Sequence, residues 1–387
     1  MRFLFISTKG DWGGSEPLWC EAAERALQEG HEVVFVLPET KELHARHKTL
    51  LAKGAHVVFR PKRQNPTLTN RIRWKIAGIL QPETQWWREQ FPHKIDAICV
   101  SQGGAYCAFN MPGLVNWLKE QRNRYYVICQ STRVPLIQSD SMRQQIGDYY
   151  SHAARVGFTA LGNKKEVEVH LASEIANSFI HQNPIDFSAA DIIPWPQASQ
   201  ALISCPSRLF VEDKGQDILL QVLASEHWAS RDFKLHFFGD GPDEAYISNL
   251  AKHLGIAHKV EFCGKAEGML PIWHKTHLVV LPSRSEGVPL VLVGAMAAGR
   301  PSVVTDVGGN AEWIRDNRDG FVARMSNVWA FSEALERAWE NRHRWREMGE
   351  AARETCLAKR DPDPAGTLLA LLRKAAEREG KAETLKS

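Results

Sequence analysis

The segment from Leu278 to Gly299 constrains the fold of this chain more than any other stretch, and it reads LVVLPSRSEGVPLVLVGAMAAG. Its first four residues are apolar, which is typical of a strand buried in a parallel sheet. A polar turn leads to Pro289, and proline suits the first position of a helix because its missing N–H would have no partner there. The apolar run that follows stops before Gly299, and glycine is typical of a helix end. Strand, loop and helix in this order predict part of a βαβ unit.

The loop of this unit holds Glu286, and the helix behind it begins with backbone N–H groups that have no partner within the helix. Such a helix start binds anions, and phosphate above all. The alternative is an ordinary corner between a strand and a helix with a solvated glutamate. On these residues alone both interpretations stay open.

The same alternation of apolar strands and helices runs along most of the chain. A first set of strands is expected at residues 3–7, 33–37, 57–59, 95–101, 125–129, 156–159 and 179–180, with helices near 18–27, 41–53 and 113–119. A second set of strands is expected at residues 201–205, 235–238, 260–263, 278–281 and 303–306, with helices near 218–224, 244–254 and 289–298 and a helical tail at 329–379.

Between the two sets, residues 187–199 contain two prolines and no clear period, which is typical of a linker. Two alternating sets around one linker predict an α/β protein with two Rossmann-like, doubly wound domains facing a cleft. We expect an N-terminal Rossmann-like domain at 1–186 and a C-terminal Rossmann-like domain at 200–360. The C-terminal helix, 361–387, is expected to pack back on the N-terminal domain.

Composition narrows the class of protein. The net charge of +3 is too small to indicate a nucleic-acid partner. The seven cysteines include no C-x-x-C pair, which indicates reduced thiols in a cytosolic setting. The apolar run Phe3 to Ile6 is too short for a signal peptide. Residues 97–118 are uncharged, but their polar residues, proline and glycines argue against a membrane span.

The most unusual composition lies in residues 60–89. Seven lysines and arginines stand there against two glutamates, a local net charge of +5, and Trp74, Trp86 and Trp87 are interleaved. This mixture suits the surface of an anionic membrane or an anionic acceptor. The alternative is a solvated basic face with the tryptophans packed inward. We therefore expect a cytoplasmic protein, with peripheral contact to the inner face of the membrane as a further hypothesis.

A glycine-rich turn, Lys9 to Ser15, follows the first strand. Glycines in this position let the backbone approach a ligand closely. The spacing is not G-x-G-x-x-G, so a dinucleotide site is not favoured.

Six short motifs along the chain match, in the same order, motifs of one known protein family. They are Gly13-Gly14-Ser15-Glu16, Asn183-Pro184-Ile185-Asp186, Arg208 with Lys214-Gly215, Gly239-Asp240-Gly241-Pro242, Pro282-Ser283 with Glu286-Gly287-Val288-Pro289-Leu290, and Thr305-Asp306-Val307-Gly308-Gly309. Together they resemble glycosyltransferase family 4, most strongly over residues 203–322 and most weakly over 60–180. The resemblance implies a GT-B fold, a nucleotide-sugar donor bound mostly by the C-terminal domain, and transfer with retention of anomeric configuration. It implies no cofactor and no required metal.

The same resemblance assigns roles to particular residues. Arg208 and Lys214 would stabilise the charge that builds on the leaving diphosphate, and neither is expected in a core. Glu286 would touch the donor sugar near its anomeric carbon, and Gln130 would contact the acceptor or a sugar. The other donor-binding residues that it implies are Gly13, Gly14, Gly239, Gly287, Val288, Pro289 and Leu290.

Two positions depart from the family pattern. The second glutamate of the family's E-x7-E pair is replaced by Gly294, and in relatives that glutamate holds the donor ribose. Gly294 would face the cleft if Glu286 does. Either the contact is lost or the small residue makes room for a bulkier group, and Gly294→Glu is expected to be tolerated structurally. At Gln130 the family often has a histidine; glutamine binds a hydroxyl but exchanges no proton.

These observations predict a retaining glycosyltransferase that acts on a glycan, a glycolipid or another glycoconjugate. A catalytically silent relative, serving as the binding partner of an active transferase, is the alternative, because Gly294 replaces a glutamate. An epimerase of nucleotide sugars with the same fold is a third reading that no residue favours.

Overall fold

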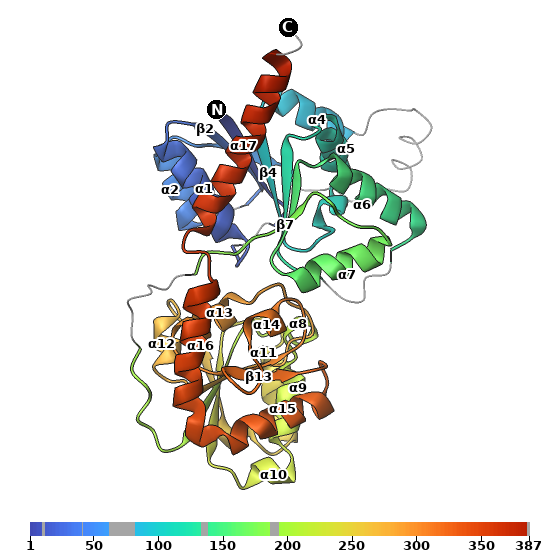
Figure 1. Ribbon diagram of the computed structural model, residues 1–387. Helices are drawn as coiled ribbons and strands as arrows, with labels where there is room; N and C mark the ends of the chain where they lie inside the picture. Colours follow the sequence, from blue (N-terminus) through green and yellow to red (C-terminus); the bar gives the residue numbers. More distant parts are fainter. Residues whose placement is uncertain (10–11, 41, 62–81, 133–137, 186–192, 385–387) are drawn as a thin grey trace. The chain divides into compact units, whose positions relative to one another are not determined.

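A computed structural model describes residues 1–387 except 10–11, 41, 62–81, 133–137, 186–192 and 385–387 (Figure 1). The chain forms two compact units. Unit 1 comprises Met1–Pro184 and Pro362–Ser387, and unit 2 comprises Ile185–Asp361.

Unit 1 is built on a parallel sheet of seven described strands in the order β3-β2-β1-β4-β5-β6-β7. The strands are β1 (Arg2–Ser7), β2 (Glu32–Pro38), β3 (His56–Arg60), β4 (Ala97–Gln102), β5 (Tyr125–Cys129), β6 (Arg155–Phe158) and β7 (Ser178–Ile180). The central strands are apolar on both faces because helices cover both sides of the sheet.

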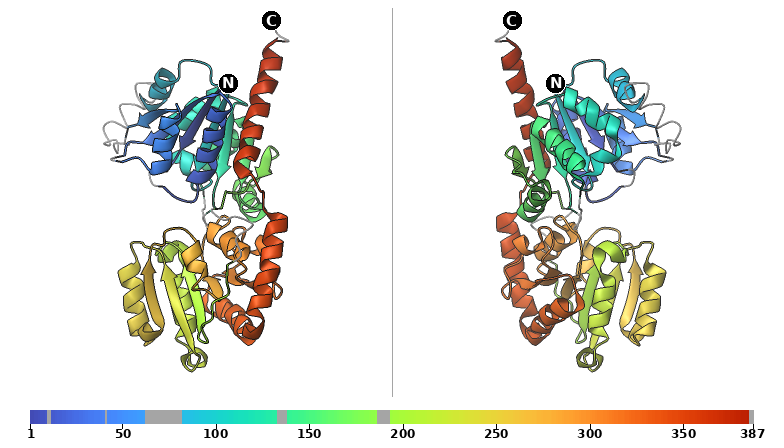
Figure 2. Two further views of the ribbon diagram at one scale, coloured as in Figure 1. Left: turned by 90° about the vertical axis from the view of Figure 1, so that its left-hand side faces the viewer. Right: turned by 90° about the vertical axis from the view of Figure 1, so that its right-hand side faces the viewer.

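The helices of unit 1 fall into two layers, seen in Figures 1 and 2. One face of the sheet shares its core with α1 (Glu16–Gln28), α2 (Ala45–Ala52) and α17 (Pro364–Thr384). The other face packs against α4 (Pro82–Gln90), α5 (Pro112–Glu120), α6 (Asp140–His152) and α7 (Leu161–Leu171), with the short helix η1 (Cys107–Asn110) nearby.

Helix α17 belongs to unit 1 although its sequence follows unit 2. Its apolar side, with Leu368 and Leu372, is buried against the core that α1 shares. The Tyr126 hydroxyl of β5 donates a hydrogen bond of 2.7 Å to the carbonyl oxygen of Leu371. Arg373 also forms an ion pair of 2.8 Å with Glu29.

Unit 2 has a parallel sheet of six described strands in the order β10-β9-β8-β11-β12-β13. The strands are β8 (Ala201–Pro206), β9 (Phe233–Phe238), β10 (Val260–Gly264), β11 (Leu278–Leu281), β12 (Ser302–Thr305) and β13 (Gly320–Ala323). The helices are α8 (Val211–Lys214), α9 (Gln216–Leu223), α10 (Glu226–Ala229), α11 (Glu244–His253), η2 (Ala257–Lys259), α12 (Leu270–Trp273), α13 (Leu290–Ala297), α14 (Asn310–Trp313), α15 (Val328–Glu340), η3 (Arg342–Arg344) and α16 (Trp345–Lys359).

The opening segment of the sequence folds as predicted, with one shift. Strand β11 has the expected bounds, and Gly299 follows α13 with φ +70°. Pro289 is the residue before the helix rather than its first residue, because its ψ of 123° is extended.

The boundary between the units differs from the expected linker. Residues 193–199 belong to unit 2 because Trp195 lies 5.3 Å, between ring centroids, from His277. Arg300 donates a hydrogen bond of 2.7 Å to the carbonyl of Pro194, and its guanidinium lies 5.1 Å from the Trp195 ring centroid. A proline-rich composition did not reveal these long-range contacts.

The hypothesis of a membrane-facing basic segment falls largely on residues 62–81, outside the described part of the chain. Of its tryptophans, Trp87 is buried and stacks on Trp117 at 5.5 Å, and Trp86 packs partly buried against the same core. These two therefore follow the inward-packed interpretation. Within the described residues, no helix combines the length and the apolar character needed to cross a membrane.

Candidate functional site

The unit 2 sheet has a topological switch point between β8 and β11. The chain proceeds from β8 outward to β9 and β10, then returns to β11 and proceeds the other way. Ligands of open α/β sheets bind at the carboxyl ends of the strands at such a point. The segments that follow β8 and β11 hold the residues that the sequence marks as catalytic, with Arg208 and Glu286 in loops and Lys214 at the end of α8.

Lys214 and Glu286 are brought together at this point. The Lys214 ammonium lies 2.7 Å from Glu286 Oε1, and the Ser283 hydroxyl donates a hydrogen bond of 2.8 Å to the same oxygen. The Glu286 side chain is 9% exposed and that of Lys214 is 24% exposed. Lys214 is not among the buried core residues, as expected, and it pairs with a buried carboxylate.

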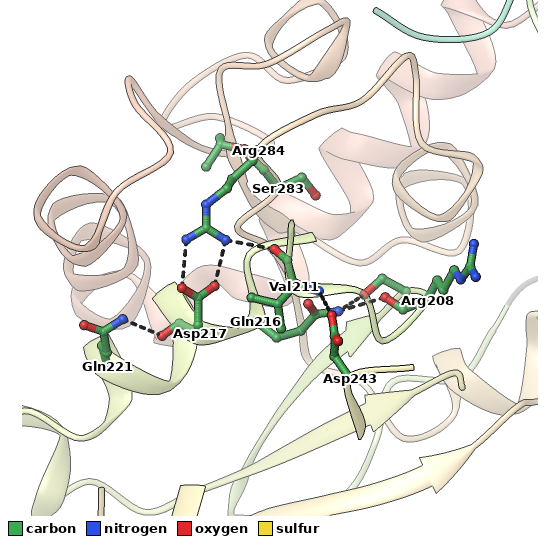
Figure 3. A network of polar contacts seen from close by, with 10 residues as sticks. Arg208, Val211, Gln216, Asp217, Gln221, Asp243, Ser283 and Arg284 are labelled. Atoms are coloured by element: carbon green, nitrogen blue, oxygen red, sulfur yellow. Dashed lines mark hydrogen bonds and ion pairs between the residues drawn. The ribbon is translucent and has the colours of Figure 1, made fainter. Parts of the chain in front are cut away.

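A second ion pair ties the two loops together, as Figure 3 shows. Arg284 binds both carboxylate oxygens of Asp217 at 2.8 Å and donates to the carbonyl of Val211, also at 2.8 Å. The backbone N–H groups of Arg284 and Ser285 both donate to the carbonyl of Asp213. A bidentate arginine–carboxylate pair fixes geometry as well as charge.

Arg208 is held by its backbone while its side chain stays exposed. Gln216 is fully buried and donates to the Arg208 carbonyl at 2.9 Å and to the Ser207 hydroxyl at 3.1 Å. The Arg208 guanidinium lies over the Phe210 ring, 5.7 Å from its centroid, and in Figure 3 it points away from the Asp217–Arg284 pair. An exposed guanidinium on an anchored loop is suited to binding a phosphate oxygen.

Two glycines permit the close approach of these loops. Gly215 has φ +64°, and a Cβ there would lie 2.2 Å from the Pro282 carbonyl oxygen. Gly239 has φ +137°, and a Cβ would lie 2.1 Å from the Ser207 carbonyl oxygen. Both positions therefore require glycine for backbone packing. Gly239, predicted to bind the donor, thus supports the Arg208 loop.

The loop after β12 supports Glu286 from the other side. The Gly309 N–H donates to the Gly287 carbonyl at 2.7 Å, and the Thr305 hydroxyl donates to the Ser283 carbonyl at 2.6 Å. This accounts for the Thr305 to Gly309 motif as packing for the β11 loop. The three further predicted donor-binding residues lie at the start of α13, and they are Val288, Pro289 and Leu290.

Gly294 packs against side chains at α12. It is buried in α13, and a Cβ there would lie 2.7 Å from Met269 Sδ and 3.3 Å from Trp273 Cζ2. The small residue therefore makes room for two side chains at α12. This packing favours the explanation that the small residue makes room for a bulkier group, and we therefore expect glutamate here to be destabilising.

The remaining predicted site residues lie in unit 1. Gly13 and Gly14 form the turn before α1, where the Gly13 carbonyl accepts from the Glu16 N–H at 3.1 Å. The Glu16 carboxylate is buried and accepts hydrogen bonds from Trp19 at 2.7 Å and from Ser7 at 3.1 Å. Burial raises the pKa of this carboxyl above its usual value.

Gln130 lies in unit 1 at the end of β5, where its side-chain oxygen accepts from the Asn183 amide at 2.6 Å. The sequence places these two residues in separate motifs and does not indicate that they meet.

Sequence reasoning also missed Gln216, Asp217 and Ser283 as supports of the site. Asp217 lies in the first turn of α9, where acids are common, so nothing in the sequence singles it out.

The one Asp-x-Asp sequence of the chain, Asp361-Pro362-Asp363, precedes α17, where Asp363 pairs with Arg25. Among the residues that the structure describes, no group of three His, Cys, Asp or Glu side chains is placed to hold a metal ion. Metal independence stays a prediction. All seven cysteines are described, and none forms a disulfide.

The architecture defines the class of fold. Over its whole length the chain is similar to the crystal structure of the Anabaena protein HepE in complex with UDP, with a TM-score of 0.65, 16% identity and 100% of both chains covered. At this identity the likeness concerns the fold, and the predicted GT-B fold of two Rossmann-like domains is confirmed.

The segment that matches a known family by sequence lies within unit 2. Residues 200–341 match the family model described as glycosyl transferases group 1. An exopolysaccharide phosphotransferase of Streptomyces coelicolor is 38% identical over 154 residues, 39% of this chain and 16% of that protein. The N-acetyl-α-D-glucosaminyl L-malate synthase of Bacillus anthracis is 34% identical over 124 residues, 32% of either chain. The chain thus spans at most about a third of the length of these relatives.

Proposed function

We propose that this protein is a retaining glycosyltransferase. It moves a sugar from a nucleotide-diphosphate donor to a glycan, a glycolipid or another glycoconjugate acceptor and requires no metal. The observation that carries the proposal is the convergence of Lys214 and Glu286 at the switch point of unit 2, within the segment that matches the glycosyl transferases group 1 model.

The chemistry needs a cation where the diphosphate leaves. When the bond between the anomeric carbon and the phosphate oxygen breaks, negative charge builds on the diphosphate. Arg208, with its exposed guanidinium, and Lys214, anchored beside Glu286, are two cations in the segment that follows β8. The N–H groups at the start of α13, around Val288 to Leu290, add a further anion-binding contribution.

Glu286 is the buried carboxylate that we propose to act on the sugar. Its pairing with Lys214 and Ser283 fixes the carboxylate, so it is preorganised to stabilise positive charge at the anomeric carbon. The new bond from the acceptor oxygen forms on the face that the phosphate leaves. The proton of the acceptor hydroxyl then passes to the departing phosphate oxygen, so that no separate base is needed. Gln130, which cannot exchange protons, is compatible with this step.

The comparisons support a nucleotide-sugar donor. One protein of similar fold was crystallised with UDP, and one sequence relative is named as a glucosaminyl malate synthase. We propose the same class of donor here. The proposed setting is the cytoplasm, with peripheral contact to an anionic membrane through residues 60–89.

Purified protein would be screened against UDP-glucose, UDP-N-acetylglucosamine and GDP-mannose for thermal stabilisation and slow release of the nucleoside diphosphate. At least one donor is expected to raise the unfolding temperature and to be hydrolysed slowly. Stabilisation with no turnover in the presence of a panel of acceptors would instead indicate the silent binding partner. No stabilisation by any nucleotide would refute both.

A further inference from the structure

Three neighbouring strands of unit 1 end in a row of buried polar residues. Gln130, Thr159 and His181 directly follow β5, β6 and β7, whose last residues are in register. All three are at most 9% exposed. They lie at the carboxyl edge of a parallel sheet, the edge at which ligands of such sheets bind.

Part of this row is satisfied by the protein itself. The Thr159 hydroxyl lies 3.1 Å from Asn163 Oδ1 and 3.3 Å from the Gln130 carbonyl oxygen. Gln102, the last residue of β4, is fully buried, accepts from the Ala108 N–H at 2.7 Å and donates to the Ala105 carbonyl at 3.4 Å. These side chains have structural partners.

In Gln130, Asn183 and His181, some buried polar atoms have no hydrogen-bond partner among the described residues. Asn183 donates to Gln130 Oε1 at 2.6 Å, but Gln130 Nε2 and Asn183 Oδ1 are buried without a hydrogen-bond partner among the described residues. Exchanging N and O in both amides leaves the same one donor and one acceptor. Neither ring nitrogen of His181 makes a hydrogen bond of normal geometry to a described residue, although the ring lies near the backbone of Cys129 and Gln182. Four such atoms gather at this edge of the sheet, and a buried polar atom is normally hydrogen-bonded.

The unpaired atoms fit a hydroxyl group. A hydroxyl both accepts and donates, so one hydroxyl can accept from Gln130 Nε2 and donate to Asn183 Oδ1, closing the half-made amide pair. Burial lowers the pKa of His181 to about 4, so the ring is neutral near pH 7 and offers one donor and one acceptor. Gln130 and Asn183 are uncharged too, so this set of atoms favours a neutral ligand over a phosphate or a carboxylate.

We infer that Gln130, His181 and Asn183 together form a site for the hydroxyl groups of a neutral sugar residue. This rests on the proposed function and deepens it, because the resemblance implied Gln130 alone and the geometry adds Asn183 and His181. The sugar belongs either to the donor or to the acceptor.

The test compares Gln130→Met and Asn183→Ser with Gln102→Met, a control that removes a buried glutamine whose partners are all internal. Calorimetry measures the affinity for UDP-glucose, UDP-N-acetylglucosamine and GDP-mannose relative to UDP and GDP. Saturation-transfer NMR measures the binding of methyl α-D-glucoside, methyl α-D-galactoside and methyl α-D-mannoside with UDP present. Circular dichroism selects the variants that fold.

For a donor sugar, the affinity ratio of nucleotide sugar to nucleotide falls about tenfold in both site variants, the loss expected for one hydrogen bond, and stays unchanged in the control. For an acceptor sugar, the glycoside signal is lost instead. If both readouts in the site variants match the control, the cluster holds only structural water and the inference is overturned. Wild-type protein that binds no nucleotide sugar would refute the proposed function, while the glycoside arm would still test the site.

Discussion

Replacing Gly294 by glutamate should destabilise unit 2 strongly. A Cβ at this position would lie 2.7 Å from Met269 Sδ and 3.3 Å from Trp273 Cζ2, so even alanine must displace the Met269 side chain. Alanine gains about 1 kcal/mol of helix propensity, which offsets part of an overpacking cost of about 1–3 kcal/mol. Glutamate adds a carboxylate on a face that packs against apolar side chains, and a buried charge with no partner costs about 3–5 kcal/mol.

For a unit of this size, a loss of 3–5 kcal/mol lowers the unfolding temperature by about 6–20 °C. Gly147 in α6 is the matched control, since a Cβ there would meet no atom within 4 Å. Gly147→Ala should therefore raise the stability of unit 1 by about 1 kcal/mol.

Differential scanning calorimetry at pH 7 measures both effects. The unfolding transition that shifts in Gly294→Glu belongs to unit 2, and the one that shifts in Gly147→Ala belongs to unit 1. The reasoning is refuted if Gly294→Glu unfolds within about 1 °C of the wild type, because Met269 and Trp273 would then not pack on this face of α13.

Three further results are expected. Arg208→Ala should lower the transfer rate by about 10²-fold or more without loss of stability, since its side chain is exposed. Lys214→Ala should lower the rate as much and should also destabilise unit 2, because it leaves the buried Glu286 carboxylate without its cation. Adding Glu286→Gln to Lys214→Ala should restore part of that stability. Near-normal rates in both single variants would contradict the role of these cations. EDTA should leave transfer unchanged, and loss of activity that a divalent ion restores would count against this. Burial lowers the pKa of His47 and of His181 to about 4, so the unfolded chain binds protons that folded unit 1 excludes. The free energy of unfolding of unit 1 should fall by about 3 kcal/mol per histidine as the pH falls from about 6.5 to 4, with no further loss from these groups below pH 4. Urea unfolding across this pH range measures the effect. If replacing both histidines by glutamine leaves the pH dependence of the unfolding free energy unchanged, the prediction is contradicted.

The sequence by itself determined the fold class and most of the strands. The run Leu278 to Leu281 and the glycine at 299 carry their information locally, in apolar character and in a backbone position that suits glycine. Helix α7 was not predicted, because this local signal is absent there. Leu161 and Val169 are exposed, and the apolar residues of the helix follow no helical period. A pattern reveals an element only where burial imposes one.

The members of the candidate site could be predicted, but their relationships could not. Arg208, Lys214 and Glu286 were identified from motifs, whereas the contact between Lys214 and Glu286 joins residues 72 positions apart. The meeting of Gln130 with Asn183 depends on the register of β5, β6 and β7. Neither distance is encoded in a local pattern.

Gly294 shows most clearly what only the tertiary structure decided. In the sequence it was a missing glutamate, with two open explanations. In the structure, the absence of a side chain at Gly294 leaves room for Met269 and Trp273. In the sequence these two residues precede β11, whereas Gly294 lies in α13 after it. A glycine has no side chain to indicate its neighbours, so its reason is visible only once the chain has packed around it.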